Sequence, residues 1–83
     1  MIVEVRLFAR ARDLAGADSV RVGLPDGATV ADLRRELAAG YPGLASLLER
    51  CAIAVNDEFA DDALTLPVPA EVAVLPPVSG GCQ

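Results

Sequence analysis

The stretch TVADLRRELAAG, residues 29–40, decides the fold of this 83-residue chain. Thr29 followed by Asp32 predicts an N-cap with a capping box, in which Asp stands in place of the preferred Glu. Gly40 and then Pro42 end the predicted helix. The apolar side chains that recur at helical spacing are Val30, Leu33, Leu37 and Ala38. The stretch therefore predicts one amphipathic helix that must cover an apolar surface elsewhere in the chain.

Two alternating segments precede this helix. Residues 2–8 and 20–24 alternate apolar with polar or small positions, which is typical of strands with one buried face. Residues 9–15 between them predict a short helical turn that Gly16 stops. Two strands so close in sequence predict an antiparallel hairpin with an unusually long connection.

Three further strands are predicted after the helix, with short segments between them. Residues 44–48 indicate a short helical piece, residues 51–55 an apolar strand, and residues 58–62 a short acidic return after a turn. Two prolines within residues 64–70 favour an edge or a loop. Residues 71–75 are apolar on both faces, which predicts a central strand.

This order of elements describes a mixed sheet of about five strands wrapped over one main helix. It predicts an α+β fold of the ubiquitin-like, β-grasp kind. We expect a single domain over residues 1–76, because two domains would each be too small to hold a core. Residues 77–83 then form a flexible carboxyl-terminal tail.

Composition excludes several functions. The formal net charge of −5 and the pI near 4.4 argue against binding to nucleic acid, which needs a basic face. The chain has no histidine and no lysine, so it lacks the residues for a catalytic triad, a Cys2His2 zinc site or Schiff-base chemistry. We expect no metal site, no catalysis by the chain alone, and a location in the cytoplasm away from membranes, since no long apolar run or leader pattern is present.

Several side chains have two interpretations. The carboxylates of Asp57, Glu58, Asp61 and Asp62 predict a solvated acidic hairpin more readily than a metal site, and they could also dock on a basic partner. Cys51 predicts a small buried residue more readily than a nucleophile. Phe8 and Phe59 are expected in the core or in an interface. Arginines expected on a solvated face are Arg10, Arg12, Arg34 and Arg35.

The end of the chain carries a Gly80-Gly81 pair after two prolines. Six residues from Pro76 to Gly81 can span about 20 Å, and glycines present no side chains. Such a segment could thread a narrow channel and bring a backbone carboxyl group to the active site of another protein. A frayed glycine-rich terminus is the other interpretation.

The chain resembles the MoaD/ThiS family of ubiquitin-like sulfur carriers, in the MoaD-like branch that forms the small subunit of molybdopterin synthase. The resemblance covers residues 1–81. Each motif alone is weak evidence. The order of the motifs, together with the Pro-Pro-Val-Ser-Gly-Gly ending, makes the resemblance specific. The matching motifs are Leu7-Phe8-Ala9-Arg10, Asp13-Leu14-Ala15-Gly16, Leu24-Pro25-Asp26-Gly27-Ala28-Thr29-Val30, Tyr41-Pro42, Val55-Asn56 and Leu75-Pro76-Pro77-Val78-Ser79-Gly80-Gly81.

The resemblance implies a specific function. The carboxylate of Gly81 would be adenylated with ATP by a MoeB-like adenylyltransferase and converted to a thiocarboxylate. That sulfur would be donated in molybdopterin biosynthesis when the tail enters a MoaE-like large subunit. The chain itself would bind no cofactor, because the ATP is used by the activating enzyme. The residues implied in contacts of the tail or with partners are Gly80, Ser79, Val78, Pro77, Phe8 and Leu75.

One departure from the family affects this expectation. Cys82 and Gln83 follow Gly81, so Gly81 as written carries an amide and no carboxylate. We expect a precursor that is cleaved between Gly81 and Cys82, with a JAMM-type metalloprotease as the candidate processing partner. Two alternatives remain: a Gly-Cys acyl shift that yields a thioester, or a neutral extension on a chain no longer used as a carrier.

Two further functions stay open at this stage. The chain could carry sulfur for another pathway, such as the synthesis of cysteine, thiamine or a thio-containing metabolite. It could instead be a ubiquitin-like modifier or a plain interaction module. The absence of lysine weighs slightly against a polymeric modifier, because the chain cannot form lysine-linked chains of itself.

Overall fold

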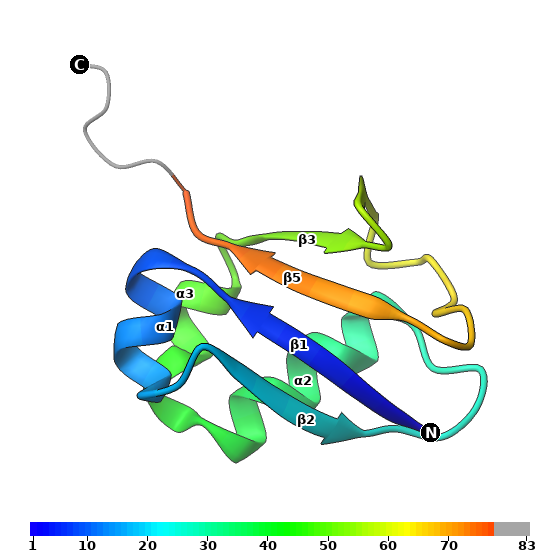
Figure 1. Ribbon diagram of the computed structural model, residues 1–83, viewed down its shortest axis with the longest axis horizontal. Helices are drawn as coiled ribbons and strands as arrows, with labels where there is room; N and C mark the ends of the chain where they lie inside the picture. Colours follow the sequence, from blue (N-terminus) through cyan, green and yellow to red (C-terminus); the bar gives the residue numbers. More distant parts are fainter. Residues whose placement is uncertain (78–83) are drawn as a thin grey trace.

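A five-stranded mixed sheet forms one layer of the molecule (Figure 1). The computed structural model describes residues 1–77. The strand order is β2-β1-β5-β3-β4, in which β1 and β5 are parallel and the other neighbours are antiparallel. The strands are β1 (Ile2–Leu7), β2 (Ser19–Gly23), β3 (Ala52–Val55), β4 (Glu58–Phe59) and β5 (Glu71–Leu75). The predicted hairpin of the first two strands and the central position of the last strand are confirmed.

The helices lie on one face of this sheet (Figure 1). The main helix α2 (Val30–Gly40) buries Leu33 and Leu37 completely against the strands. The shorter pieces are α1 (Ala9–Ala15), the 3-10 turn η1 (Pro42–Leu44) and α3 (Ala45–Leu48). The inner face of every long strand is apolar, and among residues 1–77 no polar or charged side chain is buried. The predicted α+β class and the ubiquitin-like β-grasp fold are therefore confirmed.

The capping box at the start of α2 forms as the sequence predicts. The Asp32 backbone N–H donates to Thr29 Oγ1 at 3.3 Å, and the Thr29 backbone N–H donates to Asp32 Oδ2 at 3.0 Å. The bond from the Thr29 backbone lowers the pKa of the Asp32 carboxyl. This carboxylate therefore keeps its charge at the positive end of the helix, where it stabilises the first turn.

Arg34 departs from its predicted place on a solvated face. Its side chain is only 22% exposed, and its Nε donates to Asp62 Oδ1 at 2.7 Å. Its Nη1 also donates to the Leu48 carbonyl oxygen. The side chain therefore joins α2 to two segments that are distant in sequence, which helical periodicity alone does not reveal.

The β3–β4 connection is a two-residue hairpin turn with both residues at positive φ. Asn56 has φ of 50° and Asp57 has φ of 71°. This geometry matches the right-handed twist of the strands but is unfavourable for most residues with a Cβ atom. Asn56 is held in place because its backbone N–H donates to the Glu71 carbonyl at 2.8 Å and its Oδ1 accepts from the Glu71 N–H at 2.8 Å.

We expect Asp57→Gly to stabilise the protein by about 0.5–1 kcal/mol, because glycine adopts positive φ without steric cost. The free energy of unfolding from urea titration measures the gain. Asp61→Gly is the matched control, since it removes the same charge from an exposed site outside the turn. A gain of equal size in the control would assign the effect to charge and contradict this interpretation.

Candidate docking face beside the carboxyl-terminal segment

The position of β5 sets where the end of the chain leaves the domain. β5 is parallel to β1, so the carboxyl ends of both strands lie at the same end of the sheet. Leu75 ends β5 beside Ala52 of β3, and Pro76 and Pro77 follow. Pro77, the last described residue, therefore follows a central strand at the end of the sheet where β1 leads into Phe8.

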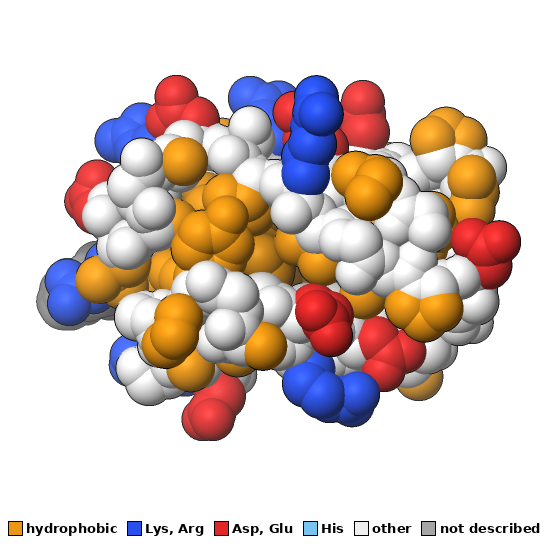
Figure 2. Space-filling view, turned by 90° about the horizontal axis from the view of Figure 1, so that it is seen from below, with side chains coloured by type: hydrophobic (Ala, Val, Ile, Leu, Met, Phe, Trp, Pro, Cys, Tyr) orange, Lys and Arg blue, Asp and Glu red, His pale blue; other side chains and the backbone are white. Residues whose placement is uncertain are grey.

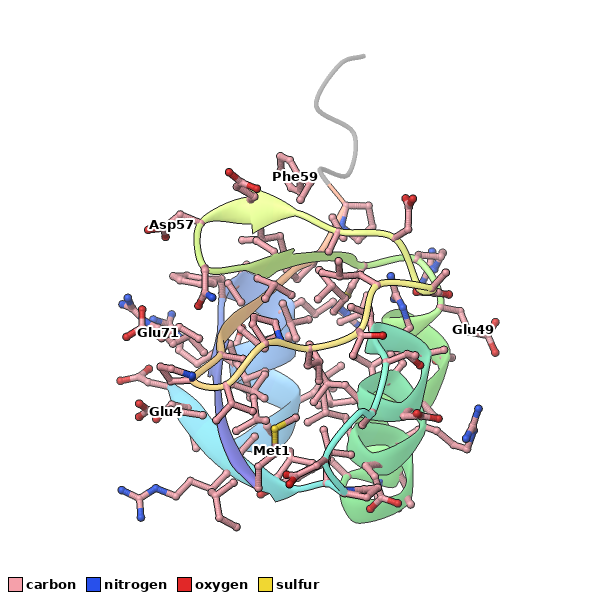
Figure 3. The ribbon with its side chains drawn as sticks, turned by 90° about the vertical axis from the view of Figure 1, so that its right-hand side faces the viewer. Met1, Glu4, Glu49, Asp57, Phe59 and Glu71 are labelled. Atoms are coloured by element: carbon pink, nitrogen blue, oxygen red, sulfur yellow. The ribbon has the colours of Figure 1, made fainter. Side chains whose placement is uncertain are left out.

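The outer face of the sheet, opposite the helices, combines apolar and charged side chains. Glu4, Glu71 and Asp57 project from this side in Figure 3. Cross-strand register places Arg6 beside Ala73, Ala73 beside Ala54, and Ala54 beside Phe59. We use the name outer apolar strip for Phe8, Ala54, Phe59, Ala73 and Leu75.

The outer apolar strip is accessible to a partner. Phe59 is 77% exposed and Phe8 is 38% exposed, so the expectation that either might lie in the core is wrong. Ala54, Ala73 and Leu75 are half-buried. The five side chains border a shallow hollow of about 280 Å³. The remaining residues that line it are Arg6, Asp57, Glu71 and Val72.

The bend after Phe8 holds its ring on the outer face. Phe8 keeps an extended backbone and continues the outward alternation of β1, while Ala9 turns the chain with φ of +52°. That conformation costs an L-residue about 1 kcal/mol. The Arg6 guanidinium lies 5.5 Å from the centroid of the Phe8 ring, within range of a cation–π contact. The ring is therefore held next to the exit of the last strand.

A second hollow, of about 560 Å³, adjoins the strip on the β1–β2 side. It contains side chains of both charge signs, among them Glu4, Arg6 and Arg12. Within residues 1–77, Arg12 pairs with Asp18 at 3.8 Å, whereas Glu4 and Arg6 form no ion pair. This hollow places charged side chains beside the outer apolar strip.

The acidic hairpin residues do not form a metal centre. Asp57, Glu58, Asp61 and Asp62 are all exposed, and Asp62 also pairs with Arg34. No group of three or more potential metal ligands gathers anywhere in residues 1–77. The prediction that these four carboxylates are solvated is therefore confirmed.

Cys51 is buried, as predicted. Its side chain is 4% exposed, and burial raises the pKa of its thiol above the ordinary value of 9.0, although Arg34 and Arg50 oppose that shift. A thiol with a raised pKa holds little thiolate at neutral pH, and the thiolate is the nucleophile. Cys51 therefore packs as a small apolar residue.

Of the residues predicted for tail and partner contacts, Phe8 and Leu75 border the same hollow, and Pro77 follows Leu75 by two residues. Val78, Ser79, Gly80, Gly81 and Cys82 lie outside the described residues. Sequence reasoning left Phe59 undecided and did not single out Ala54 or Ala73. The period-two spacing of Ala73 and Leu75 was the available signal, because it marks one face of a strand.

No helix within the described part of the chain is long and apolar enough to cross a membrane. The fold defines a ubiquitin-like β-grasp protein, and its exposed apolar strip at the end of the last strand is a candidate docking face. The chain belongs to the ThiS family, whose model matches residues 5–81. The family resemblance drawn from the sequence motifs is thereby confirmed.

Curated relatives match along nearly the whole chain. A molybdopterin synthase sulfur carrier subunit from Chlamydomonas reinhardtii is 37% identical and covers 98% of this chain and 100% of its own length. The human protein of the same name is 34% identical, over 95% of this chain and 93% of its own.

Solved structures also match along nearly the whole chain. SAMP1 from Haloferax volcanii superposes with a TM-score of 0.88 at 31% identity, over 98% of this chain and 100% of its own. A complex of subunits 1 and 2 of the molybdopterin-converting factor from Helicobacter pylori contains a chain that matches with a TM-score of 0.69 at 30% identity. This match covers 98% of the present chain and 100% of the other.

We expect Cys51 in a Cys82→Ser variant to resist alkylation by iodoacetamide at neutral pH until the protein is unfolded, because its thiol is buried and its pKa is raised. Mass spectrometry after a timed reaction, with and without urea, measures the labelled fraction. The Cys51→Ala variant, which keeps Cys82, is the control that shows whether the iodoacetamide is active. Rapid labelling of the native Cys82→Ser protein would contradict the structural role of Cys51.

Proposed function

We propose that this chain is a ubiquitin-like sulfur carrier, the small subunit of molybdopterin synthase, that donates sulfur from the carboxyl group of Gly81. The proposal is supported by the ThiS family match and by full-length relatives named as molybdopterin synthase sulfur carrier subunits. The observation that carries it is the outer apolar strip beside the exit of β5, because a tail that works in another protein needs a surface that docks there.

The proposed chemistry takes place on the backbone carboxyl group. The Gly81 carboxylate attacks the α-phosphate of ATP on an adenylyltransferase and pyrophosphate leaves. A sulfur donor at the oxidation level of sulfide then displaces AMP, so that a C–S bond replaces the acyl phosphate bond. This chain contributes the acyl group and its positioning, and partners contribute the catalytic side chains. Such a division fits a chain without histidine or lysine.

Gly81 must first be released from Cys82. An amide carbonyl between two residues has no carboxylate to adenylate, so the chemistry requires cleavage of the Gly81–Cys82 bond. A JAMM-type metalloprotease is the proposed processing partner. The acyl-shift alternative uses the Cys82 thiol in place of a protease, and the two routes differ in their need for that sulfur atom.

The intact mass of the chain tests this proposal. We expect protein that ends at Gly81 to become about 16 Da heavier with the adenylyltransferase, ATP and sulfide, since sulfur replaces one carboxylate oxygen. Protein that ends at Gln83 should stay unchanged until extract from the native cells is added.

A Cys82→Ser precursor separates the two release routes. It should be processed and thiolated like the wild type if a protease acts, and should stay inert if the acyl shift acts. A mass that remains that of the full chain in cells that require the molybdenum cofactor would overturn the carrier proposal.

A protein modifier is the second candidate, favoured by one observation. The matching Haloferax volcanii structures include one described as small archaeal modifier protein 1, with a TM-score of 0.80 at 30% identity. A modifier would use the same released Gly81 carboxyl to acylate a lysine of a target. Lysine-linked conjugates of this chain in cell extracts would favour this candidate, and a small sulfur-containing product would favour the carrier.

We expect Phe59→Ser to weaken binding to the molybdopterin synthase large subunit about tenfold or more, because an exposed aromatic side chain in a docking face is a typical hot spot. Titration calorimetry measures the dissociation constant. Val68→Ser is the matched control, since Val68 is 71% exposed but lies outside the outer apolar strip. Equal effects of the two substitutions, or none from Phe59→Ser, would contradict the assigned docking face.

A further inference from the structure

The edge strand β2 presents a row of backbone groups that point away from the sheet. Leu24 and Met1 exchange hydrogen bonds in both directions, and the Leu7 N–H donates to the Asp18 carbonyl. Because bonded pairs alternate in an antiparallel ladder, every even-numbered residue of β2 bonds to β1. The N–H and C=O groups of Ser19, Arg21 and Gly23 therefore face outward, and no residue of the described chain hydrogen-bonds to them.

The two edges of the sheet differ in how well they are protected. The opposite edge, β4, has only two residues and follows the acidic turn at Asp57, both of which discourage pairing with another strand. β2 has five residues and regular register with β1, and it contains no proline. Its three outward-facing positions, Ser19, Arg21 and Gly23, are all exposed. β2 is therefore the edge that can accept a further strand.

The core is least covered beneath this edge. Val20 and Val22 keep 8% and 7% of their surface exposed, more than any other buried core side chain. The face of the molecule that carries β2 and α2 shows a recess in which apolar side chains reach the surface (Figure 2). A strand added to β2 would direct every second side chain toward this recess.

We propose that β2 binds an extended segment of a partner protein, with an acidic residue opposite Arg21 and apolar residues on either side of it. A partner that hydrogen-bonds to the outward N–H and C=O groups of Ser19, Arg21 and Gly23 must itself be an extended strand. The partner residue opposite Arg21 would lie on the outer face of the sheet. Glu4 of β1 lies next to Arg21 on one side, and the partner residue would take the open position on the other side. The two partner residues next to it would point toward the inner face and cover Val20 and Val22.

A second copy of this chain fits this edge less well. A two-fold pairing that joins all three outward-facing residues sets Arg21 opposite Arg21, which places like charges directly across from each other. A shift by two residues avoids this contact but leaves fewer bonded residues. The formal net charge of −5 on each copy adds repulsion. The partner is therefore a different chain.

The test uses the full chain and two short peptides, without any other protein, so it is independent of the proposed sulfur chemistry. The probe is the blocked peptide Thr-Val-Glu-Val-Thr, and its counterpart carries Lys in place of Glu. Amide chemical shifts in 15N-labelled protein follow the titration. We expect saturable shifts at residues 18–24, slower hydrogen exchange at Arg21 and Gly23, and binding about tenfold weaker for the Lys peptide.

Two substitutions at Gly23 isolate the backbone contribution. Gly23→Pro removes one outward N–H while the bonds between β1 and β2 stay intact, and it should weaken binding about tenfold. Gly23→Ala is the matched control, because its added Cβ lies 3.7 Å from the Ile2 side chain, an ordinary contact, and the N–H is kept. It should bind like the wild type, and the thermal midpoint of each variant shows that it is folded.

Two substitutions of arginine isolate the charge. Arg21→Glu should reverse the preference between the two peptides, whereas Arg50→Glu, the same charge change at an exposed site outside β2, should leave it intact. The proposal is overturned if no shifts occur up to about 5 mM peptide, if they fall on Phe8, Ala73 and Leu75, or if Gly23→Pro binds like the wild type. Shifts in β2 that depend on protein concentration, with a doubled mass and no peptide, would also overturn it in favour of a second copy.

Discussion

The parallel pairing of β1 with β5 is the constraint on which the rest of the structure depends. It joins residues near opposite ends of the described chain, with Glu4 beside Glu71 and Leu7 beside Val74. Parallel neighbours require a crossover connection, and here that crossover includes the main helix α2. The pairing therefore fixes which face of the sheet α2 covers and at which end of the sheet the described chain ends.

The sheet is covered on one side only. The helices and loops bury the inner face, whereas the outer face keeps an apolar strip that no part of residues 1–77 covers. Exposed apolar area next to charged side chains is the usual composition of a surface that binds another protein. The proposed docking surface therefore needs no insertion into the fold, because one face of the sheet is left open.

Much of the fold follows from local sequence patterns, whereas the site depends on contacts that no local pattern contains. The capping box at Thr29 and the alternation of β1 were predictable, because each depends on residues a few positions apart. Arg34 and Phe59 were not, since their environments are set by Asp62 and by the pairing of β4 with β3. For the motif residues beyond Pro77, composition and spacing left a threading tail and a frayed terminus open, and only the family resemblance favoured the first; the structure does not describe these residues.

The pairing of the first strand with the last makes the docking face a property of the whole domain. Phe8 follows β1, whereas Ala73 and Leu75 belong to β5, so the outer apolar strip needs residues from both ends of the described chain. Closing so long a loop costs entropy that is recovered only when most other contacts are in place. A chain that has folded only its first hairpin would offer a partner no complete surface. Recognition of this face would therefore distinguish folded molecules from incomplete ones, a form of quality control that needs no separate chaperone.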